Sequence, residues 1–306
     1  MENQKQPTLE STLKSSDTEE FIDIHFYRPI GYQWALLFQK LGVTPNAVTI
    51  ASIFLGVGSG VCFYFENIWM TLLGIFLLVW ANSYDSADGQ LARMTKQFSP
   101  LGRVLDGLAG NLWFISIYVA ICLRLFPEWG WAIWVLAVIT GAAHSKQASM
   151  ADYYRNIHLL FLKGKSGSEL DNTEDLKENN KHLTWAKDFW TKLVAVFYWN
   201  YTAGQQSWAP KFQDLRKKLD AVYGNNIPES FRLKFRERSF PLMKWTNILS
   251  FNTRAIALMV AMLINLPWVY FVFELTVLTV ILFYMINKHE NICKKFLQEI
   301  EEGLYK

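Results

Sequence analysis

The dominant feature of this chain is a set of apolar stretches, each about as long as a helix that crosses a bilayer. A bilayer core about 30 Å thick needs about 20 apolar residues in a helix. Charged residues make up only 19% of the 306 residues, whereas about a quarter is usual in soluble domains. We therefore expect an all-α, polytopic membrane protein with six transmembrane helices, at residues 46–65, 68–84, 104–126, 129–143, 247–266 and 268–287.

The charges and tryptophans between these stretches predict the topology. The connections at 66–68, 126–129 and 265–268 carry almost no Lys or Arg, whereas the opposite connections are basic and should therefore be cytoplasmic. Six spans then place both termini inside, in a multi-pass protein of the cell (inner, cytoplasmic) membrane. The tryptophans expected at the outer ends are typical of an interfacial belt, and they are Trp69, Trp129, Trp131, Trp134 and Trp268.

The remaining segments divide around the spans. An amphipathic pattern predicts a helix on the membrane surface before the first span. Thr44 and Pro45 are a helix cap and a first helical residue, so they should mark the start of that span. The expected order is 1–22 as a disordered cytoplasmic tail, 23–155 as the interfacial helix and transmembrane helices 1–4, 156–242 as a cytoplasmic helical insertion, 243–290 as transmembrane helices 5–6, and 291–306 as a cytoplasmic tail.

The insertion and the cysteines add further expectations. A polar linker at 163–180 should precede insertion helices at 183–199 and 212–223. The net charge of +3 is dispersed, so no nucleic-acid partner is expected. The three cysteines have no paired spacing, so we expect neither a disulfide framework nor a Cys-based metal site; they are Cys62, Cys122 and Cys293.

Acidic residues gather where the second span should meet the cytoplasm. Asp85 and Asp88 project from the same side of a helix, and Asp106 lies on the next, antiparallel helix. Ionisable groups at membrane depth normally face a polar cavity and mark an ion or substrate path. Carboxylate oxygens suit Mg²⁺ or Mn²⁺, which usually share a substrate's phosphates. The three acids therefore predict a divalent-cation site.

Small and basic residues follow the acids. Gly89 and Ala92 leave room for a ligand beside the backbone, and Arg93 offers a fork of donors suited to phosphate. Together with the acids, this pattern indicates a nucleotide-diphosphate site. The alternative is an ordinary charged loop in which the acids pair with nearby cations such as Lys96 and Arg103.

The complete string D-x2-D-G-x2-A-R-x8-G-x3-D resembles the signature of the CDP-alcohol phosphotransferase (phosphatidyltransferase) family. The L-G-V-T-P-N run at 41–46 is also similar to the start of that family's first span. The resemblance implies phospholipid biosynthesis: a phospho-alcohol group moves from a CDP-linked donor to an acceptor hydroxyl, CMP is released, and Mg²⁺ or Mn²⁺ is required. It implies metal ligands at Asp85, Asp88 and Asp106, and a CDP pocket lined by Gly89, Ala92, Arg93 and Gly102.

The resemblance leaves the substrates open. We favour a CDP-linked lipid donor, CDP-diacylglycerol in particular, and an alcohol acceptor. The alternative is a soluble CDP-alcohol donor with a lipid acceptor. Members of the family are commonly homodimers, so the resemblance also implies a homodimer in the lipid bilayer.

The chain departs from the family signature at Gly110, where the family has a fourth Asp that is thought to help hold a second metal and to take the acceptor's proton. Three explanations remain open. Gly110 permits close helix packing, together with Gly107 and Ala109, in an enzyme whose base lies elsewhere. Alternatively, the missing side chain makes room for a bulkier acceptor, or the protein has lost catalysis.

Polar residues on the expected fourth and fifth spans are candidates for the remaining roles. His144 and Asp152 lie on a small and polar stripe of the fourth span and could accept a proton. His144 could equally be a buried imidazole with a backbone partner, and Asp152 could pair with Arg155. Arg254 lies in an apolar helix and should meet an anion. That anion is either the acceptor's phosphate or carboxylate, or else a structural acid or a lipid headgroup.

Two other classes of function compete with the enzyme. Loss of the fourth acid at Gly110 and the long insertion would suit a non-catalytic membrane protein that binds CDP-lipid and acts as a partner of another enzyme. A transporter is less favoured, because the acids gather at one end of the bundle and we expect no matching acids in the other spans.

Overall fold

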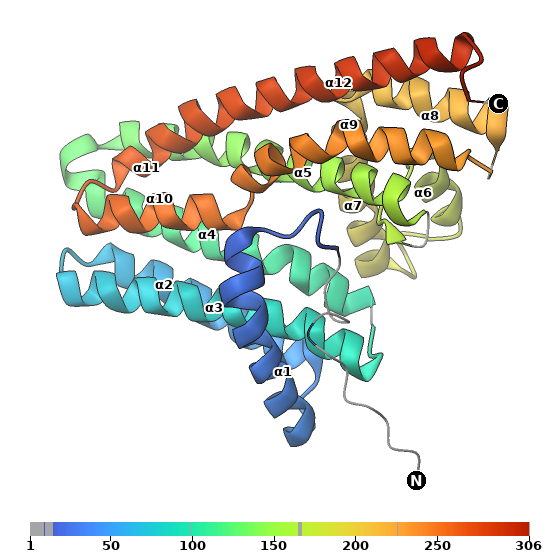
Figure 1. Ribbon diagram of the computed structural model, residues 1–306. Coiled ribbons are helices and arrows are strands. Elements are labelled where there is room, and N and C mark those ends of the chain that lie inside the picture. Colours follow the sequence, from blue (N-terminus) through green and yellow to red (C-terminus); the bar gives the residue numbers. More distant parts are fainter. Residues whose placement is uncertain (1–8, 10–14, 99, 165–166, 225, 306) are drawn as a thin grey trace. The chain divides into compact units, whose positions relative to one another are not determined.

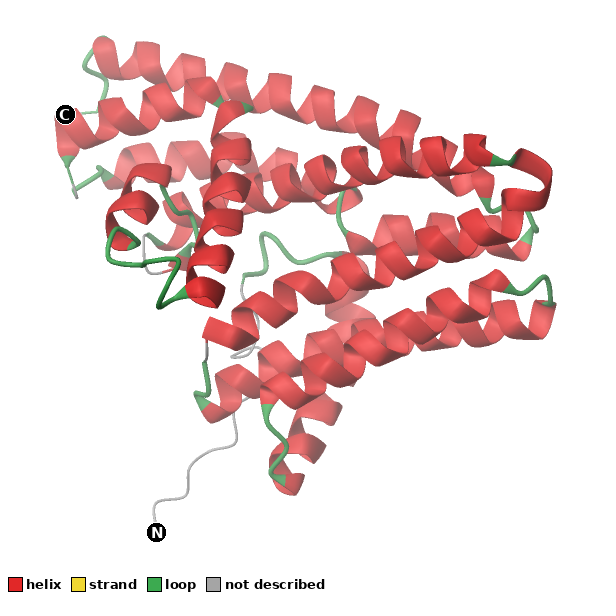
Figure 2. Ribbon diagram, turned by 180° about the vertical axis from the view of Figure 1, so that it is seen from behind, coloured by secondary structure: helices red, strands yellow, loops and turns green. Residues whose placement is uncertain are grey.

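All regular elements in the described part of the chain are helices, which confirms the all-α class (Figures 1 and 2). The computed structural model describes the chain apart from residues 1–8, 10–14, 99, 165–166, 225 and 306. The side chains of residues 100, 101, 103, 104 and 106 are also outside the described part. The chain forms two compact units, Met1–Gly141 with Arg254–Leu275, and Ala142–Thr253 with Thr276–Lys306.

The first unit contains the helices that carry the acidic motif. A π-helical turn η2 (Asp23–Tyr27) leads directly into α1 (Arg28–Leu41), at the place where the amphipathic pattern predicted a helix. The unit continues with α2 (Pro45–Tyr64), α3 (Ile68–Thr95), α4 (Pro100–Trp129), the start of α5 (Trp131–Lys163), most of α10 (Phe251–Leu263) and α11 (Trp268–Phe273). The predicted cap of α2 is confirmed, because the Thr44 side chain accepts a hydrogen bond from the backbone N–H of Ala47 at 3.4 Å.

Two glycines allow the helices of this unit to pack closely. A Cβ atom at Gly60 on α2 would lie only 2.8 Å from the backbone carbonyl carbon of Ser116 on α4. A Cβ atom at Gly31 on α1 would lie 3.1 Å from the backbone nitrogen of Ala87 on α3. Small residues at such contacts let helix backbones approach each other in membranes. They hold α1 and α2 against the helices that carry the motif.

The second unit holds the end of α5 together with the insertion and the C-terminal helix. Its other elements are α6 (Thr173–Asn179), α7 (Phe189–Ser207), α8 (Pro210–Tyr223), α9 (Glu229–Ile248) and α12 (Thr279–Glu301), and the π-helical turn η4 (Glu274–Leu278) precedes α12. Aromatic side chains fill its core, including Phe161, Phe231, Phe235 and Phe296, which stack or tilt against one another.

The insertion differs in detail from its prediction. The first insertion helix was expected from residue 183 but begins at Phe189, because Asp188 turns back to accept a hydrogen bond from the Thr184 backbone N–H at 3.1 Å. The linker expected at 163–180 contains the short helix α6, which the Asn172 side chain caps. The second insertion helix, α8, lies within two residues of its predicted bounds.

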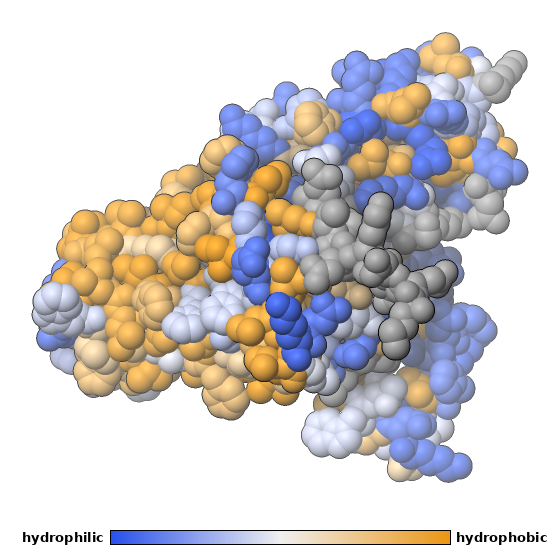
Figure 3. Space-filling model, turned by 60° about the horizontal axis from the view of Figure 1, so that its bottom comes forward, coloured by the Kyte–Doolittle hydropathy of each residue, from blue (hydrophilic) through white to orange (hydrophobic). Residues whose placement is uncertain are grey.

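Several helices are long and apolar enough to cross a membrane, which indicates a multi-pass membrane protein. Figure 3 shows a broad hydrophobic surface beside hydrophilic regions, and large apolar side chains such as Phe54, Trp69 and Trp131 are each 75% exposed. Within the described residues, five segments qualify as spans: Pro45–Tyr64, Ile68–Thr95, Gly107–Trp129, Glu229–Leu263 and Trp268–Glu301.

The expected fourth span is not among these five. It corresponds to the first half of α5, which is apolar until Gly141, but His144, Lys146 and Gln147 follow at once and lower the hydropathy of any longer window. An apolar run shorter than about 18 residues is not by itself a transmembrane signal.

Candidate functional site

The acidic motif lies in the last turns of α3. We call residues 85–93 the motif segment. Its two acids, Asp85 and Asp88, are three residues apart on one helix, so they lie on the same side of α3 as the sequence predicted. The helix ends two residues beyond the motif segment, at Thr95, and Lys96 follows with a left-handed backbone at φ 57°. The motif segment is therefore rigid helix up to the connection to α4.

Asp88 is buried and oriented by a hydroxyl group from α2. Its side chain is 4% exposed, and the Thr49 hydroxyl donates to its Oδ2 atom at 2.5 Å. The same hydroxyl lies 3.1 Å from the Pro45 carbonyl oxygen. A hydroxyl has one proton, and the shorter bond to a charged acceptor is the stronger one. Thr49 therefore positions the carboxylate of Asp88.

Thr49 was missed when the sequence was read, because a single Thr in an apolar helix is ordinary. The signal that could have found it is its place four residues after Pro45, in the first turns of the helix whose start the Thr-Pro pair marks. Only the packing of α2 on α3 shows that its hydroxyl meets an acid 39 positions later in the chain.

The guanidinium group of Arg93 lies over the backbone of Gly89. A Cβ atom at Gly89 would be 3.5 Å from both terminal nitrogens of Arg93. A side chain at this position would contact the guanidinium, whereas glycine leaves room between the group and the helix. Ala92 and Arg93 are both partly exposed. The guanidinium group of Arg93 thus follows Asp88 by little more than one turn of α3. A phosphate could contact both this group and the surface of the helix there.

The buried residues of the motif segment that do not carry the acids pack against α1. Ala87 and Leu91 are fully buried and pack in one core with Ala35 of α1. Gln90 is also fully buried, and its side-chain nitrogen donates to the Arg28 carbonyl oxygen at 3.1 Å. The amphipathic helix before the first span therefore supports the acidic segment directly.

The third acid, Asp106, lies on α4, but its side chain is outside the described residues. Gly102 lies one turn earlier on α4 and is partly exposed. Cβ atoms at Gly107 and Gly110 would meet no described atom within 4 Å. The three explanations of Gly110 stay predictions.

The two base candidates lie in the second unit, on α5. His144 is partly exposed. The carboxylate of Asp152 accepts hydrogen bonds from the Asn156 side chain at 3.1 Å and from the Tyr201 hydroxyl at 3.3 Å. Arg155, the expected partner of Asp152, donates to the Ser250 hydroxyl at 2.7 Å. Because the acids of α3 lie in the first unit, the roles of both candidates stay predictions.

Lys146, between these two candidates, packs inward within the second unit. Its ammonium group donates to the Gly204 carbonyl oxygen at 2.7 Å and lies 4.5 Å from the centre of the Trp208 ring. The insertion helix α7 thus supplies the hydrogen-bond acceptor for this ammonium group.

Arg254 is paired with an acid that the sequence analysis overlooked. Its guanidinium donates to the carboxylate of Glu274, which also accepts a hydrogen bond from the Tyr118 hydroxyl. Arg254 is 1% exposed and Glu274 is fully buried. The expectation that the other spans lack acids was therefore wrong. The structural acid, one of the anions considered for Arg254, is present, and the ion pair balances its charge.

Comparisons with known proteins agree with the motif. Residues 42–151, which include α2, α3 and the motif segment, match the family model described as CDP-alcohol phosphatidyltransferase. This part of the chain is therefore a domain of the CDP-alcohol phosphatidyltransferase family, as the resemblance of the motif implied.

Curated relatives match the same kind of domain. A protein of Aquifex aeolicus named bifunctional IPC transferase and DIPP synthase is 29% identical over 130 residues, which are 40% of this chain and 29% of the relative. The archaetidylinositol phosphate synthase of Pyrococcus horikoshii is 37% identical over 90 residues, which are 29% of this chain and 46% of the relative. The chain thus spans less than half the length of either relative.

The hydrogen bond between Thr49 and Asp88 yields a first prediction. We expect Thr49→Val to weaken Mn²⁺ binding by about tenfold, because loss of an outer-shell hydrogen bond leaves a ligating carboxylate unoriented. Thr49→Ser keeps the hydroxyl and should bind as the parent does. Electron paramagnetic resonance of free Mn²⁺ during titration of the purified protein measures both affinities. Equal affinity of Thr49→Val and the parent would refute this role for Thr49.

The buried ion pair yields a second prediction. Glu274→Gln should lower the free energy of unfolding in detergent by about 3–5 kcal/mol, because Arg254 then keeps a buried charge without its counter-charge. The double variant Arg254→Leu with Glu274→Leu should recover most of the lost stability. Denaturant unfolding of the two variants and the parent provides the comparison, and a single variant as stable as the parent would contradict the pairing. Activity of a stable double variant would exclude a role of Arg254 in binding the acceptor.

Proposed function

We propose that this chain is a phospholipid-synthesising phosphotransferase. It would move a phosphatidyl (phospho-alcohol) group from a CDP-linked lipid to an acceptor hydroxyl and release CMP. The observation that carries this proposal is the motif segment, because its buried, hydroxyl-oriented Asp88 and its phosphate-type Arg93 lie together on α3 within the matched residues 42–151. CDP-diacylglycerol is the proposed donor, since a lipid nucleotide can reach a site at the end of a transmembrane helix from the bilayer.

The donor set fits a hard divalent cation. Asp88 offers a carboxylate that the Thr49 hydroxyl orients, and Asp85 lies one turn away on the same side of α3. We propose Asp85, Asp88 and Asp106 as ligands of Mg²⁺ or Mn²⁺. When bound, such an ion neutralises charge on the diphosphate and on the leaving CMP.

The other motif residues would bind the nucleotide. Gly89 and Ala92 leave the surface of α3 open to the diphosphate, Arg93 donates to a phosphate oxygen, and Gly102 lines the CDP pocket from α4. The attack on phosphorus then requires mainly positioning and electrostatic stabilisation, with no covalent intermediate. His144 or Asp152 would accept the proton of the acceptor hydroxyl.

Two observations support a proposal for the chemical class of the acceptor: the space beside Gly110 and the name of one relative. A Cβ atom at Gly110 would meet no described atom within 4 Å, so a bulky acceptor has room there. One relative is named archaetidylinositol phosphate synthase. We therefore propose a phosphorylated polyol, and inositol phosphate is the first to test. A soluble CDP-alcohol donor with a lipid acceptor is the alternative that substrate trials would reveal.

We also propose that α5 is the sixth membrane span. Its 33 residues exceed the length needed to cross a bilayer, and its apolar first half continues into a small and polar stripe that suits the interior of a helix bundle. Six spans place both termini and the motif segment on the cytoplasmic side of the cell membrane.

The proposed reaction predicts CMP release that depends on the motif acids. The purified parent should release CMP from CDP-diacylglycerol in the presence of Mg²⁺ or Mn²⁺ and inositol phosphate. Asp88→Asn should lower the rate at least about 100-fold, because the ligand loses its charge. Asp220→Asn is the matched control, since Asp220 is an exposed acid on α8. A rate for Asp88→Asn equal to that of the control would remove the assigned metal site.

A variant at Gly110 can distinguish an enzyme from a non-catalytic binding protein. The absence of the fourth acid at Gly110 is the feature that supports the non-catalytic alternative. A Cβ atom at Gly110 would meet no described atom within 4 Å. If the chain is an enzyme with its base elsewhere, Gly110→Asp should change turnover by less than about tenfold while Asp88→Asn abolishes it. If the parent is silent and Gly110→Asp gains turnover, the parent is a non-catalytic protein that binds CDP-lipid. Assays of CMP release with the three proteins side by side decide between these results.

A further inference from the structure

The last helix carries a group of metal-binding side chains that the proposed reaction does not use. His289 and Cys293 are one turn apart on α12, and they are 1% and 0% exposed. Glu290 lies beside His289 and is partly buried. This part of α12 belongs to the second unit, where it packs among aromatic side chains of α5, α8 and α9, including Tyr154, Phe212 and Phe235.

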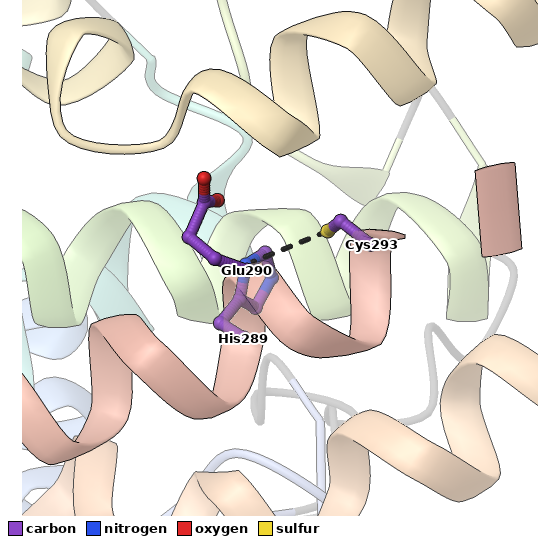
Figure 4. A group of neighbouring side chains, drawn as sticks. All are labelled: His289, Glu290 and Cys293. Carbon is purple, nitrogen blue, oxygen red and sulfur yellow. Dashed lines mark hydrogen bonds between the residues drawn. The ribbon is translucent and has the colours of Figure 1, made fainter. Parts of the chain in front are cut away.

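The three side chains are close enough to share one ion. The Nδ1 atom of His289 lies 3.7 Å from the Sγ atom of Cys293, as Figure 4 shows. One ligand atom from each of the three residues lies within 4.8 Å of the others. Bonds of about 2.3 Å from zinc to sulfur and about 2.0–2.1 Å to nitrogen place the two atoms about 3.6 Å apart at a tetrahedral angle. The observed separation of nitrogen and sulfur matches this value.

Buried polar atoms around the group lack hydrogen-bond partners in the described structure. They are Nε2 of His289, Oε1 of Glu290 and the hydroxyl of Tyr154. The Tyr154 ring lies 4.3 Å from the His289 ring, and its hydroxyl is within electrostatic reach of Glu290 and Cys293. Native proteins seldom leave buried polar atoms unpaired, so such a concentration indicates an absent ligand, water or ion.

A second buried histidine of the same unit shows the ordinary arrangement. His158 is fully buried, and its Nδ1 atom lies 2.7 Å from the Ser239 hydroxyl. The Nδ1 atom of His289 instead lies 3.7 Å from the Cys293 thiol. The Nδ1 partners of the two histidines therefore differ, a hydroxyl for His158 and the Cys293 thiol for His289, although both residues are in the core. His158 provides a matched control.

Glu290 is held in place by another helix. Its Oε2 atom accepts a hydrogen bond from the Lys211 backbone N–H at 2.7 Å, at the start of α8. The Phe212 backbone N–H also interacts with this carboxylate. Oε1 has no hydrogen bond of good geometry in the described structure. Backbone donors that fix a carboxylate in this way are typical outer-shell partners of metal ligands.

We propose that His289, Glu290 and Cys293 bind one borderline-soft divalent cation of the Zn²⁺ class, separate from the hard-cation site on α3. A nitrogen, a sulfur and an oxygen ligand together suit zinc better than magnesium or manganese. Binding displaces the thiol proton of Cys293 to solvent, and the thiolate becomes a ligand. Because Glu290 also caps α8, the ion would fasten α12 to α8.

The test uses a spectroscopic signal that only a sulfur ligand gives. Purified full-length protein, stripped of metal in detergent, is titrated with Co²⁺ and then with Zn²⁺. We expect a near-ultraviolet thiolate-to-cobalt charge-transfer band that saturates at about one Co²⁺ per chain and that Zn²⁺ abolishes. The midpoint of thermal unfolding should rise with Zn²⁺ present and fall after chelation. The aspartates of α3 give no such band because they contain no sulfur.

Variants assign the signal to its residues. Cys293→Ser and His289→Gln should lose the band, whereas Cys62→Ser and His158→Gln should keep it, since each control residue is a buried cysteine or histidine outside the group. Asp88→Asn should also keep it. A parent protein with no charge-transfer band, or a band that persists in Cys293→Ser, would overturn the proposal. The parent titration is decisive even if a variant fails to fold.

Discussion

A hydrogen bond from the Thr49 hydroxyl to the Asp88 carboxylate ties the first turns of α2 to the last turns of α3. A carboxylate buried among apolar helices is costly unless it is paired, and the Thr49 hydroxyl supplies one such partner. We propose that this carboxylate and the neighbouring Asp85 ligate a cation. The packing of α1 against the opposite side of α3, through Gly31, Ala87 and Gln90, fixes this arrangement before any ligand binds. Such preorganisation is what phosphoryl-type transfer requires of a protein.

The second buried acid of the first unit has a different character. Glu274 lies at the π-helical turn between α11 and α12, where it accepts hydrogen bonds from both Arg254 and Tyr118. This hydrogen-bond network joins α4, α10 and η4 in the buried interior of the first unit. A buried charge paired with an arginine and a tyrosine suits a structural role, whereas the printed partner of Asp88 is a single neutral hydroxyl. The contrast between Glu274 and Asp88 shows why exposure alone does not identify a functional acid.

Much of this architecture could be predicted from local patterns. The apolar stretches, the Thr44 cap and the acidic motif depend on neighbouring residues, and the structure agrees with them at α2, α3 and α4. Long-range partners could not be predicted. Neither the bond to Thr49 nor the pairing of Arg254 with Glu274 has a sequence signature, because each joins helices that are distant in the chain.

Other departures arose from reading residues one at a time. The three explanations of Gly110 could not be separated from the sequence, because the atoms around that position depend on how the helices pack. The cysteine of α12 was assigned to a tail, because the polar sequence after residue 290 conceals a helix whose buried side includes His289, Cys293 and Phe296. Tertiary packing of α8 and α9 covers that side, and single-helix patterns do not reveal it.

The most direct test of the central claim is the position of a bound cation and nucleotide. A structure of the protein with Mn²⁺ and CDP, in which the ion is located by its anomalous scattering, would show both. The account predicts a manganese peak within coordination distance of the carboxylates of Asp85 and Asp88, with the diphosphate beside Arg93. Manganese and cytidine bound away from α3, or neither bound at saturating concentration, would contradict it.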